Sequence, residues 1–140
     1  MKNLLNSLLN ILLVDDDPVS NFLAKKNLEK LGFKHVDTVE NGQEALDYLD
    51  YQAPDLLFLD LNMPVMDGLE FLKKIKEKDL LDKIRVIVLT SSIRPEDKAK
   101  SLNYENVLDY VEKPLNEEKI ERLLLKLSTK DAIKSLYSKN

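Results

Sequence analysis

Hydrophobic residues fall into five short runs of strand length, separated by longer segments of helical period. The runs lie at 11–14, 35–39, 55–59, 85–89 and 107–111. Three of them contain the segments ILLV, LLFL and VIVL, which are apolar at every position. Such runs are typical of strands buried on both faces of a parallel sheet. Their alternation with helices predicts right-handed crossovers and a doubly wound α/β sheet with helices on both sides.

The segments between the runs carry their own helix signals. Apolar residues between 22 and 31 recur near helical spacing up to Gly32, and glycine suits the position just after a helix. Asn and Asp cap helix N-termini and Pro suits the first turn. We therefore expect further helices to begin at Asn41, at Asp67, near Pro95 and at Asn116.

A chain of 140 residues with 44% hydrophobic and 33% charged residues has the size and composition of one globular domain. We divide it into an N-terminal extension at 1–9, a domain at 10–128 and a polar tail at 129–140. Cysteine is absent, which excludes disulfides and thiol catalysis, and a single histidine, His35, leaves no pair of histidines for zinc.

Charge and hydropathy limit the kinds of partner and the cellular compartment that we expect for this chain. The formal net charge of -4 gives no general attraction to nucleic acid or anionic lipid. No apolar stretch is long enough for a membrane helix, and no cleavage pattern of a signal peptide follows the leucine-rich start. We therefore expect a cytoplasmic protein without direct contacts to nucleic acid or membrane.

Chemically active side chains follow four of the five runs: Asp15 and Asp16, then Asp60, Thr90 and Lys113. The carboxyl ends of parallel strands meet at one edge of the sheet, so these groups should converge there. Three neighbouring acids need either a raised pKa or a bound cation, and Mg²⁺ prefers such oxygen ligands. Acids, Mg²⁺, an ammonium and a hydroxyl together predict a site for phosphoryl transfer.

Nucleotide-binding loops do not explain this chemistry. The three glycines are isolated, and neither GxxxxGK[ST] nor GxGxxG occurs. A carboxylate that itself accepts the phosphoryl group remains. Asp60 is the best placed for this role, because it stands alone at the end of the central apolar run.

Four segments resemble the receiver domain of two-component response regulators in order and spacing: ILLVDDDPVSNFL, PDLLFLDLNMPVMDG, VIVLTSS and DYVEKPL. The resemblance covers residues 10–128 and implies a flavodoxin-like fold, a five-stranded parallel sheet of order 2-1-3-4-5 with five helices in three α/β/α layers. It assigns Asp60 as the phosphoacceptor. It also implies that Asp15, Asp16, Asp60 and the backbone carbonyl of Asn62 ligate Mg²⁺ or Mn²⁺.

The same resemblance assigns roles after the last two runs. Thr90 matches the hydroxyl residue that hydrogen-bonds the phosphoryl group, and Lys113 matches the lysine that forms an ion pair with it. Pro114 follows Lys113, as in relatives where this peptide bond is usually cis. Tyr110 matches the aromatic switch that turns inward when Thr90 moves.

These assignments describe a free-standing response regulator, and the short polar ends favour that over a piece of a hybrid kinase. A sensor histidine kinase or a histidine phosphotransfer protein would donate the phosphoryl group to Asp60. The chain would act on its own Asp60 only and would not be an enzyme. Output would pass by protein contact through the face of helix four, strand five and helix five, and a phosphorylation-dependent homodimer stays open.

Two other function classes stay open from the sequence. The chain could be an interaction module that uses a receiver fold without phosphorylation, or, with less support, a phosphatase with Asp60 as its nucleophile. Purely structural interpretations also apply to single residues, because Asp17 suits a helix cap and Tyr110 could simply pack in the core or at its rim. The segments 92–95 and 102–106 depart from the usual family pattern, which leaves the identity of the partner open.

Overall fold

The computed structural model describes the backbone at residues 4–80, 82–92 and 94–137, and the side chains of that part as far as Leu127. A 3-10 helix, η1 (Leu4–Leu8), precedes a strict alternation of strands and α-helices. The strands are β1 (Asn10–Val14), β2 (His35–Val39), β3 (Leu56–Leu59), β4 (Val86–Thr90) and β5 (Val107–Glu112). The helices are α1 (Pro18–Lys30), α2 (Gly42–Leu49), α3 (Gly68–Glu77), α4 (Pro95–Leu102) and α5 (Glu117–Tyr137).

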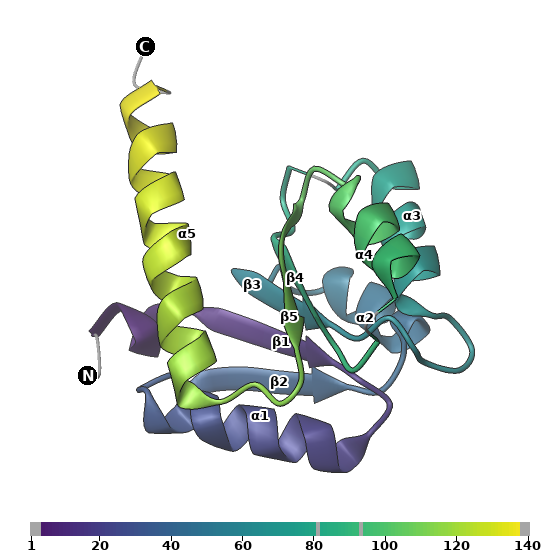
Figure 1. Cartoon of the computed structure of the whole chain (residues 1–140), viewed down its shortest axis with the longest axis horizontal. Helices are drawn as coiled ribbons and strands as arrows, with labels where there is room; N and C mark the ends of the chain where they lie inside the picture. The colour runs from purple at the N-terminus through teal and green to yellow at the C-terminus, as the bar shows by residue number, and fades with distance from the viewer. Residues whose placement is uncertain (1–3, 81, 93, 138–140) are drawn as a thin grey trace.

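All strand pairs are parallel, in the order β2-β1-β3-β4-β5, which confirms the predicted fold class. Alternate residues of the central strands enter two separate cores. Leu12 and Val14 of β1 pack on one face of the sheet, while Ile11 and Leu13 pack on the other. Figure 1 shows α1 and α5 on one side of the sheet and α2, α3 and α4 on the other. Both faces are thus covered, which explains why these strands are apolar at every position.

The predicted helix starts are confirmed by side-chain caps. Asp17, Asn41, Asp67 and Asn116 each accept a backbone N–H from the first turn of the helix that follows. Helix α4 begins at Pro95 without a side-chain cap. The backbone of Gly32, just after α1, has a φ of 99°, a left-handed conformation that glycine adopts without strain.

Strand β5 contains an irregularity that the hydrophobic pattern does not predict. Val86 pairs with Val107, but the next residue of β4, Ile87, pairs with Asp109, so one residue of β5 is left over. This β-bulge changes the side-chain alternation. As a result Val107 and Tyr110, an odd number of residues apart, pack on the same core beneath α2, α3 and α4.

The two ends of the chain add to the domain. In η1, buried Asn6 donates a hydrogen bond of 2.8 Å from Nδ2 to the Leu31 carbonyl, while Leu4, Leu5 and Leu8 are exposed. Helix α5 extends beyond the sheet in Figure 1 and continues to Tyr137, so most of the segment assigned as a tail continues the last helix. Residues 1–3 and 138–140 of the two assigned ends lie outside the described residues.

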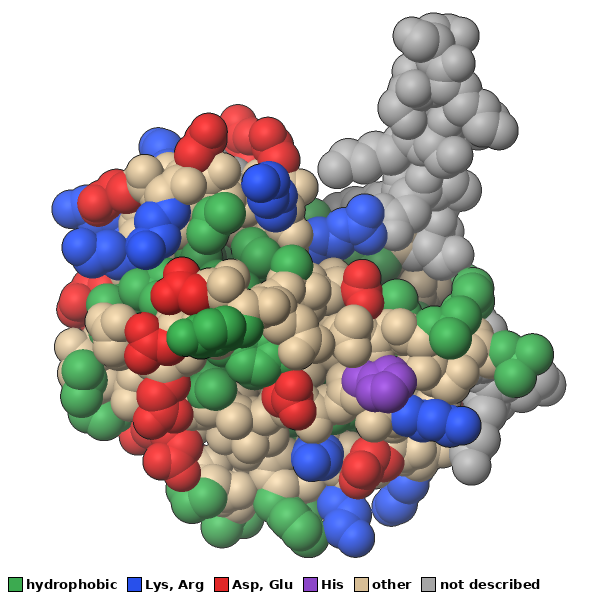
Figure 2. Space-filling view, turned by 180° about the vertical axis from the view of Figure 1, so that it is seen from behind, with side chains coloured by type: hydrophobic (Ala, Val, Ile, Leu, Met, Phe, Trp, Pro, Cys, Tyr) green, Lys and Arg blue, Asp and Glu red, His purple; other side chains and the backbone are tan. Residues whose placement is uncertain are grey.

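The remaining surface is mixed in charge. His35 is exposed on β2 and appears as the purple side chain among scattered acidic and basic groups in Figure 2. Within the described residues, no helix combines the length and apolar character needed to span a bilayer. Two residues used to predict α1, Phe22 and Leu23, point to solvent, being 58% and 52% exposed.

Candidate functional site

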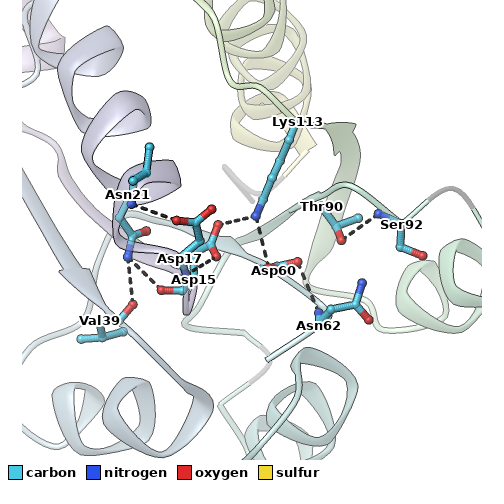
Figure 3. A network of polar contacts seen from close by, with 10 residues as sticks. Asp15, Asp17, Asn21, Val39, Asp60, Asn62, Thr90, Ser92 and Lys113 are labelled. Carbon is cyan, nitrogen blue, oxygen red and sulfur yellow. Dashed lines mark hydrogen bonds and ion pairs between the residues drawn. The ribbon is translucent and has the colours of Figure 1, made fainter. Parts of the chain in front are cut away.

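The carboxyl ends of β1, β3, β4 and β5 bring the predicted side chains together at one edge of the sheet (Figure 3). Asp15 directly follows β1 and Asp60 directly follows β3. Thr90 is the last residue of β4, and Lys113 directly follows β5. Four positions spread over most of the chain thus form one polar cluster, as the sequence predicts.

Lys113 is the link between the two buried acids. Its Nζ lies 2.5 Å from Asp15 Oδ2 and 3.2 Å from Asp60 Oδ2. The loop that carries Lys113 contains a cis peptide bond between Lys113 and Pro114, and it is tied to α1 by a 2.9 Å hydrogen bond from Asn27 Nδ2 to the Leu115 carbonyl. The loop is therefore held against α1, and the Lys113 ammonium lies between the two carboxylates.

Burial dominates the electrostatics of Asp60. The residue is only 5% exposed, and loss of solvent raises the pKa of its carboxyl group despite the opposing charge of Lys113. The charge of Asp15 raises this pKa further, while the Thr90 hydroxyl and the Asn62 N–H lower it. Burial by itself would lower the pKa of Lys113, but the hydrogen bond with Asp15 and the charge of Asp60 outweigh it and raise this pKa.

Three carboxylates form a group suited to a cation. One oxygen each from Asp15, Asp16 and Asp60 lie within 4.8 Å of one another. Asp15 and Asp60 are buried while Asp16 is exposed, so the group opens to solvent on one side. Hard oxygen donors with an open side fit Mg²⁺, which keeps several waters. Asn62 lies beside the group, and its N–H donates 3.3 Å to Asp60 Oδ1.

A second set of contacts joins Thr90 to Tyr110. The backbone N–H of Ser92 donates to Thr90 Oγ1 at 3.2 Å, and the Tyr110 hydroxyl donates to the Ser92 carbonyl at 2.6 Å. Tyr110 packs partly buried against the core beneath α2, α3 and α4. Burial raises the pKa of the Tyr110 hydroxyl, and the nearby charge of Asp97 adds to this effect.

Two positions at this edge were not predicted from sequence. Asn21 of α1 is buried and donates from Nδ2 to the carbonyls of Asp15 (2.9 Å) and Val39 (3.3 Å), which fixes the end of β1 (Figure 3). Gly68 begins α3 so close to the end of β3 that a Cβ atom there would lie 2.5 Å from the Asp60 carbonyl oxygen. A sequence signal exists only for the glycine, which directly follows the cap residue Asp67.

Comparison with known proteins places this geometry in one family. The family model described as response regulator receiver domain matches residues 11–125. The two-component response regulator 24 of Arabidopsis thaliana is 34% identical over 129 residues, which covers 91% of this chain and 90% of that protein. The chain covers 59% of the probable transcriptional regulator ycf29 of Porphyra purpurea, which is also 34% identical.

Solved structures give the same result. A two-component response regulator from Cytophaga hutchinsonii is similar with a TM-score of 0.77 and 29% identity, over 86% of this chain and 96% of that one. The chemotaxis response regulator CheY4 of Vibrio cholerae is similar with a TM-score of 0.73 and 28% identity, over 84% of this chain and 97% of that one.

Proposed function

The chain belongs to the family of response regulator receiver domains, and from this premise we propose that it accepts a phosphoryl group on Asp60. Receiver domains are signalling proteins of two-component systems that receive phosphoryl groups from histidine kinases. The observation that carries the assignment to Asp60 is its position. Among the described residues at this edge, it is the one carboxylate that is buried, contacts Lys113 and lies beside the hydroxyl of Thr90.

The three carboxylates support a bound Mg²⁺ or Mn²⁺ ion. Asp15, Asp16 and Asp60 would hold it, together with the backbone carbonyl of Asn62. A bound divalent ion would offset negative charge on the carboxylates and on the incoming phosphoryl oxygens. The open side at Asp16 supports this, because solvent molecules and a phosphoryl oxygen need room beside the ion.

In the proposed transfer, an oxygen of the Asp60 carboxylate attacks the phosphorus of a phosphohistidine. The new O–P bond forms as the N–P bond breaks, and the histidine ring nitrogen leaves with the electron pair. Lys113 is placed to stabilise the charge of the phosphoryl oxygens, since its ammonium already contacts Asp60. Thr90, which is fully buried beside this point, would donate a hydrogen bond from its hydroxyl to the phosphoryl group.

The surface around Asp60 supports a protein as the phosphodonor. Val19 and Leu23 of α1 are 63% and 52% exposed, and with Pro114 they line an open hollow next to Lys113. A histidine on a protein partner could reach Asp60 across such an apolar rim. We assign a sensor histidine kinase or a histidine phosphotransfer protein as this partner.

Output in this proposal depends on Tyr110. Phosphorylation would draw Thr90 toward Asp60 and favour the packed position of Tyr110. The Tyr110 hydroxyl contacts the carbonyl of Ser92 in the loop between β4 and α4. The face of α4, β5 and α5 would then bind a downstream protein in the cytoplasm.

Intact mass after incubation with acetyl phosphate tests the proposal. We expect wild type to gain one phosphoryl group only when Mg²⁺ is present, and Asp60→Asn to gain none. Asp50→Asn is the matched control, because Asp50 is exposed at the end of α2 and away from the acidic edge. Folded wild type that stays unmodified and also fails to bind beryllofluoride would contradict the proposal and favour an interaction module that works without phosphorylation.

A further inference from the structure

Ser92, in the loop between β4 and α4, is a junction for three interactions. Its N–H donates to Thr90 Oγ1 at 3.2 Å, its carbonyl accepts the Tyr110 hydroxyl at 2.6 Å, and its own hydroxyl donates to Asp97 Oδ2 at 2.9 Å. The first two bonds join the two switch residues to each other. The third joins both of them to the first turn of α4.

The bond from Ser92 to Thr90 sets the direction of the threonine proton. A hydroxyl has one proton to donate, and Thr90 Oγ1 already accepts the Ser92 N–H. The proton is therefore directed away from Ser92. In Figure 3 Thr90 lies between Ser92 and Asp60, so the position of Ser92 decides how well this proton is presented to a group on Asp60.

Helix α4 has an unusual N-terminus that points to the role of Asp97. The cap position of this helix, Arg94, makes no side-chain cap hydrogen bond, whereas α1, α2 and α3 each have an Asp or Asn cap. Two acids, Glu96 and Asp97, lie in the first turn, and Asp97 uses its carboxylate for Ser92. The next residue, Lys98, places Nζ 5.8 Å from the centre of the Tyr110 ring, within the range of a cation–π contact.

We propose that Asp97 is a positioning residue for the phosphorylation switch, which it serves by holding Ser92 so that Thr90 and Tyr110 keep the arrangement that favours a phosphoryl group on Asp60. This inference rests on the proposed phosphorylation of Asp60. It extends that function to α4, because the helix is then tied to the switch by a side-chain hydrogen bond and by the packing of Lys98.

The affinity for beryllofluoride, a mimic of the phosphoryl group, tests the role of Asp97. We expect Asp97→Ala to weaken beryllofluoride binding about three- to tenfold in saturating Mg²⁺, the scale of one hydrogen bond to a charged group. The affinity for Mg²⁺ alone should stay unchanged, because Asp97 is not one of the three grouped carboxylates, Asp15, Asp16 and Asp60. Asp97→Asn keeps an acceptor oxygen and should restore binding to within about twofold.

Glu96→Ala is the matched control. Glu96 lies in the same first turn, so its substitution removes the same charge from the N-terminus of α4. Its side chain is exposed, and it is the neighbour of Asp97, which accepts the hydrogen bond from Ser92. Labelling with 3-fluorotyrosine gives a second measurement, since the ¹⁹F resonance of Tyr110, assigned with Tyr110→Phe, should move in Asp97→Ala and stay in Glu96→Ala.

Several outcomes would overturn the inference. Equal beryllofluoride affinities of Asp97→Ala and Glu96→Ala would do so. A loss of Mg²⁺ affinity in Asp97→Ala as large as its loss of beryllofluoride affinity would also do so, because it would indicate that the whole site is disturbed. If Asp97→Ala does not fold, Ser92→Ala removes the other half of the bond and should give the same loss of affinity. Wild type that binds Mg²⁺ but neither beryllofluoride nor phosphate would contradict the proposed function itself, a result distinct from any difference between the variants.

Discussion

Two corners of the same sheet edge are built from different interactions. The acidic corner, formed by Asp15, Asp16, Asp60 and Lys113, holds three carboxylates and one ammonium at the ends of β1, β3 and β5. The switch corner consists of Thr90 at the end of β4, Ser92, Asp97 and Tyr110. It is held by hydrogen bonds in which each hydroxyl has a partner or faces Asp60.

The difference between the two corners indicates how a change of charge at Asp60 can be transmitted. Negative charge is in excess in the acidic corner, so that corner gains from a cation and from a protein ammonium. The switch corner has only one carboxylate, that of Asp97, and its hydrogen bonds depend on the position of one loop residue, Ser92. Thr90 belongs to both corners, because its hydroxyl faces Asp60 and its oxygen accepts from Ser92. A short chain of hydrogen bonds thus joins Asp60 to α4 through Thr90, Ser92 and Asp97, and we propose that a change at Asp60 is transmitted along it.

The largest effect that we predict comes from removing the one ammonium of the acidic corner. Lys113→Ala should slow phosphorylation by acetyl phosphate about 100-fold, because the phosphoryl oxygens lose the ammonium that would stabilise them. Lys126→Ala is the control, since Lys126 pairs with Asp109 of β5 at 3.2 Å and lies outside the acidic corner. The rates come from intact mass over time, and an equal decrease in both variants would contradict the role of Lys113.

A pair of glycines tests how tightly the acidic corner is packed. Gly68 and Gly42 each begin a helix after an Asp or Asn cap, but the Cβ of an alanine would meet backbone atoms at Gly68 and the flexible Met66 side chain at Gly42. We expect Gly68→Ala to lower the free energy of unfolding by about 2–3 kcal/mol and Gly42→Ala by less than about 1 kcal/mol. Urea unfolding measures both, and the reverse order would show that the loop after Asp60 moves freely.

The excess charge of the acidic corner should be visible as stability. Because burial raises the pKa of Asp60, its carboxyl group binds a proton more tightly in the folded protein than in the unfolded chain. The ionised carboxylate therefore destabilises the folded protein at neutral pH. Asp60→Asn should therefore raise the free energy of unfolding by about 1 kcal/mol at pH 7 without Mg²⁺.

This gain over wild type should shrink in two conditions. It should shrink as pH falls through the raised pKa of Asp60, since wild type then becomes neutral at this position. It should also shrink when Mg²⁺ is added to wild type. Thermal unfolding at pH 7 and at acidic pH checks both, and a gain independent of pH would contradict the charge excess.

The smallest effect concerns the switch corner. Tyr110→Phe loses the hydrogen bond to the Ser92 carbonyl and should lower the free energy of unfolding by about 0.5–1.5 kcal/mol. Tyr51→Phe should have no measurable effect, because Tyr51 is 92% exposed. Equal unfolding curves for the two variants would show that the Tyr110 hydroxyl contributes no stability and would weaken the case for a switch corner held by hydrogen bonds.

Much of the fold was predictable because it rests on local signals. The all-apolar runs predicted strands covered on both faces, and Asp17, Asn41, Asp67 and Asn116 marked helix starts that their side-chain caps confirm. The convergence of Asp15, Asp60, Thr90 and Lys113 followed from the rule that parallel strands end at one edge. The roles proposed for these residues remain predictions.

Other features had no local signal. The exposure of Phe22 and Leu23 could not be predicted, since helical spacing gives a face but not what covers it. The bulge in β5 was equally hidden, although it decides that Tyr110 packs beneath α2, α3 and α4. Such features depend on pairing between segments distant in sequence.

The sequence by itself determined the order of strands and helices, the helix caps and the identity of the acidic residues, because period, capping chemistry and strand ends are properties of short segments. Only the tertiary structure decided the contact of Lys113 with both Asp15 and Asp60, the close approach of Gly68 and the junction at Ser92. The contacts of Lys113 with the two acids and of Tyr110 with Ser92 join separate crossovers, and all these distances depend on how the helices pack against the sheet.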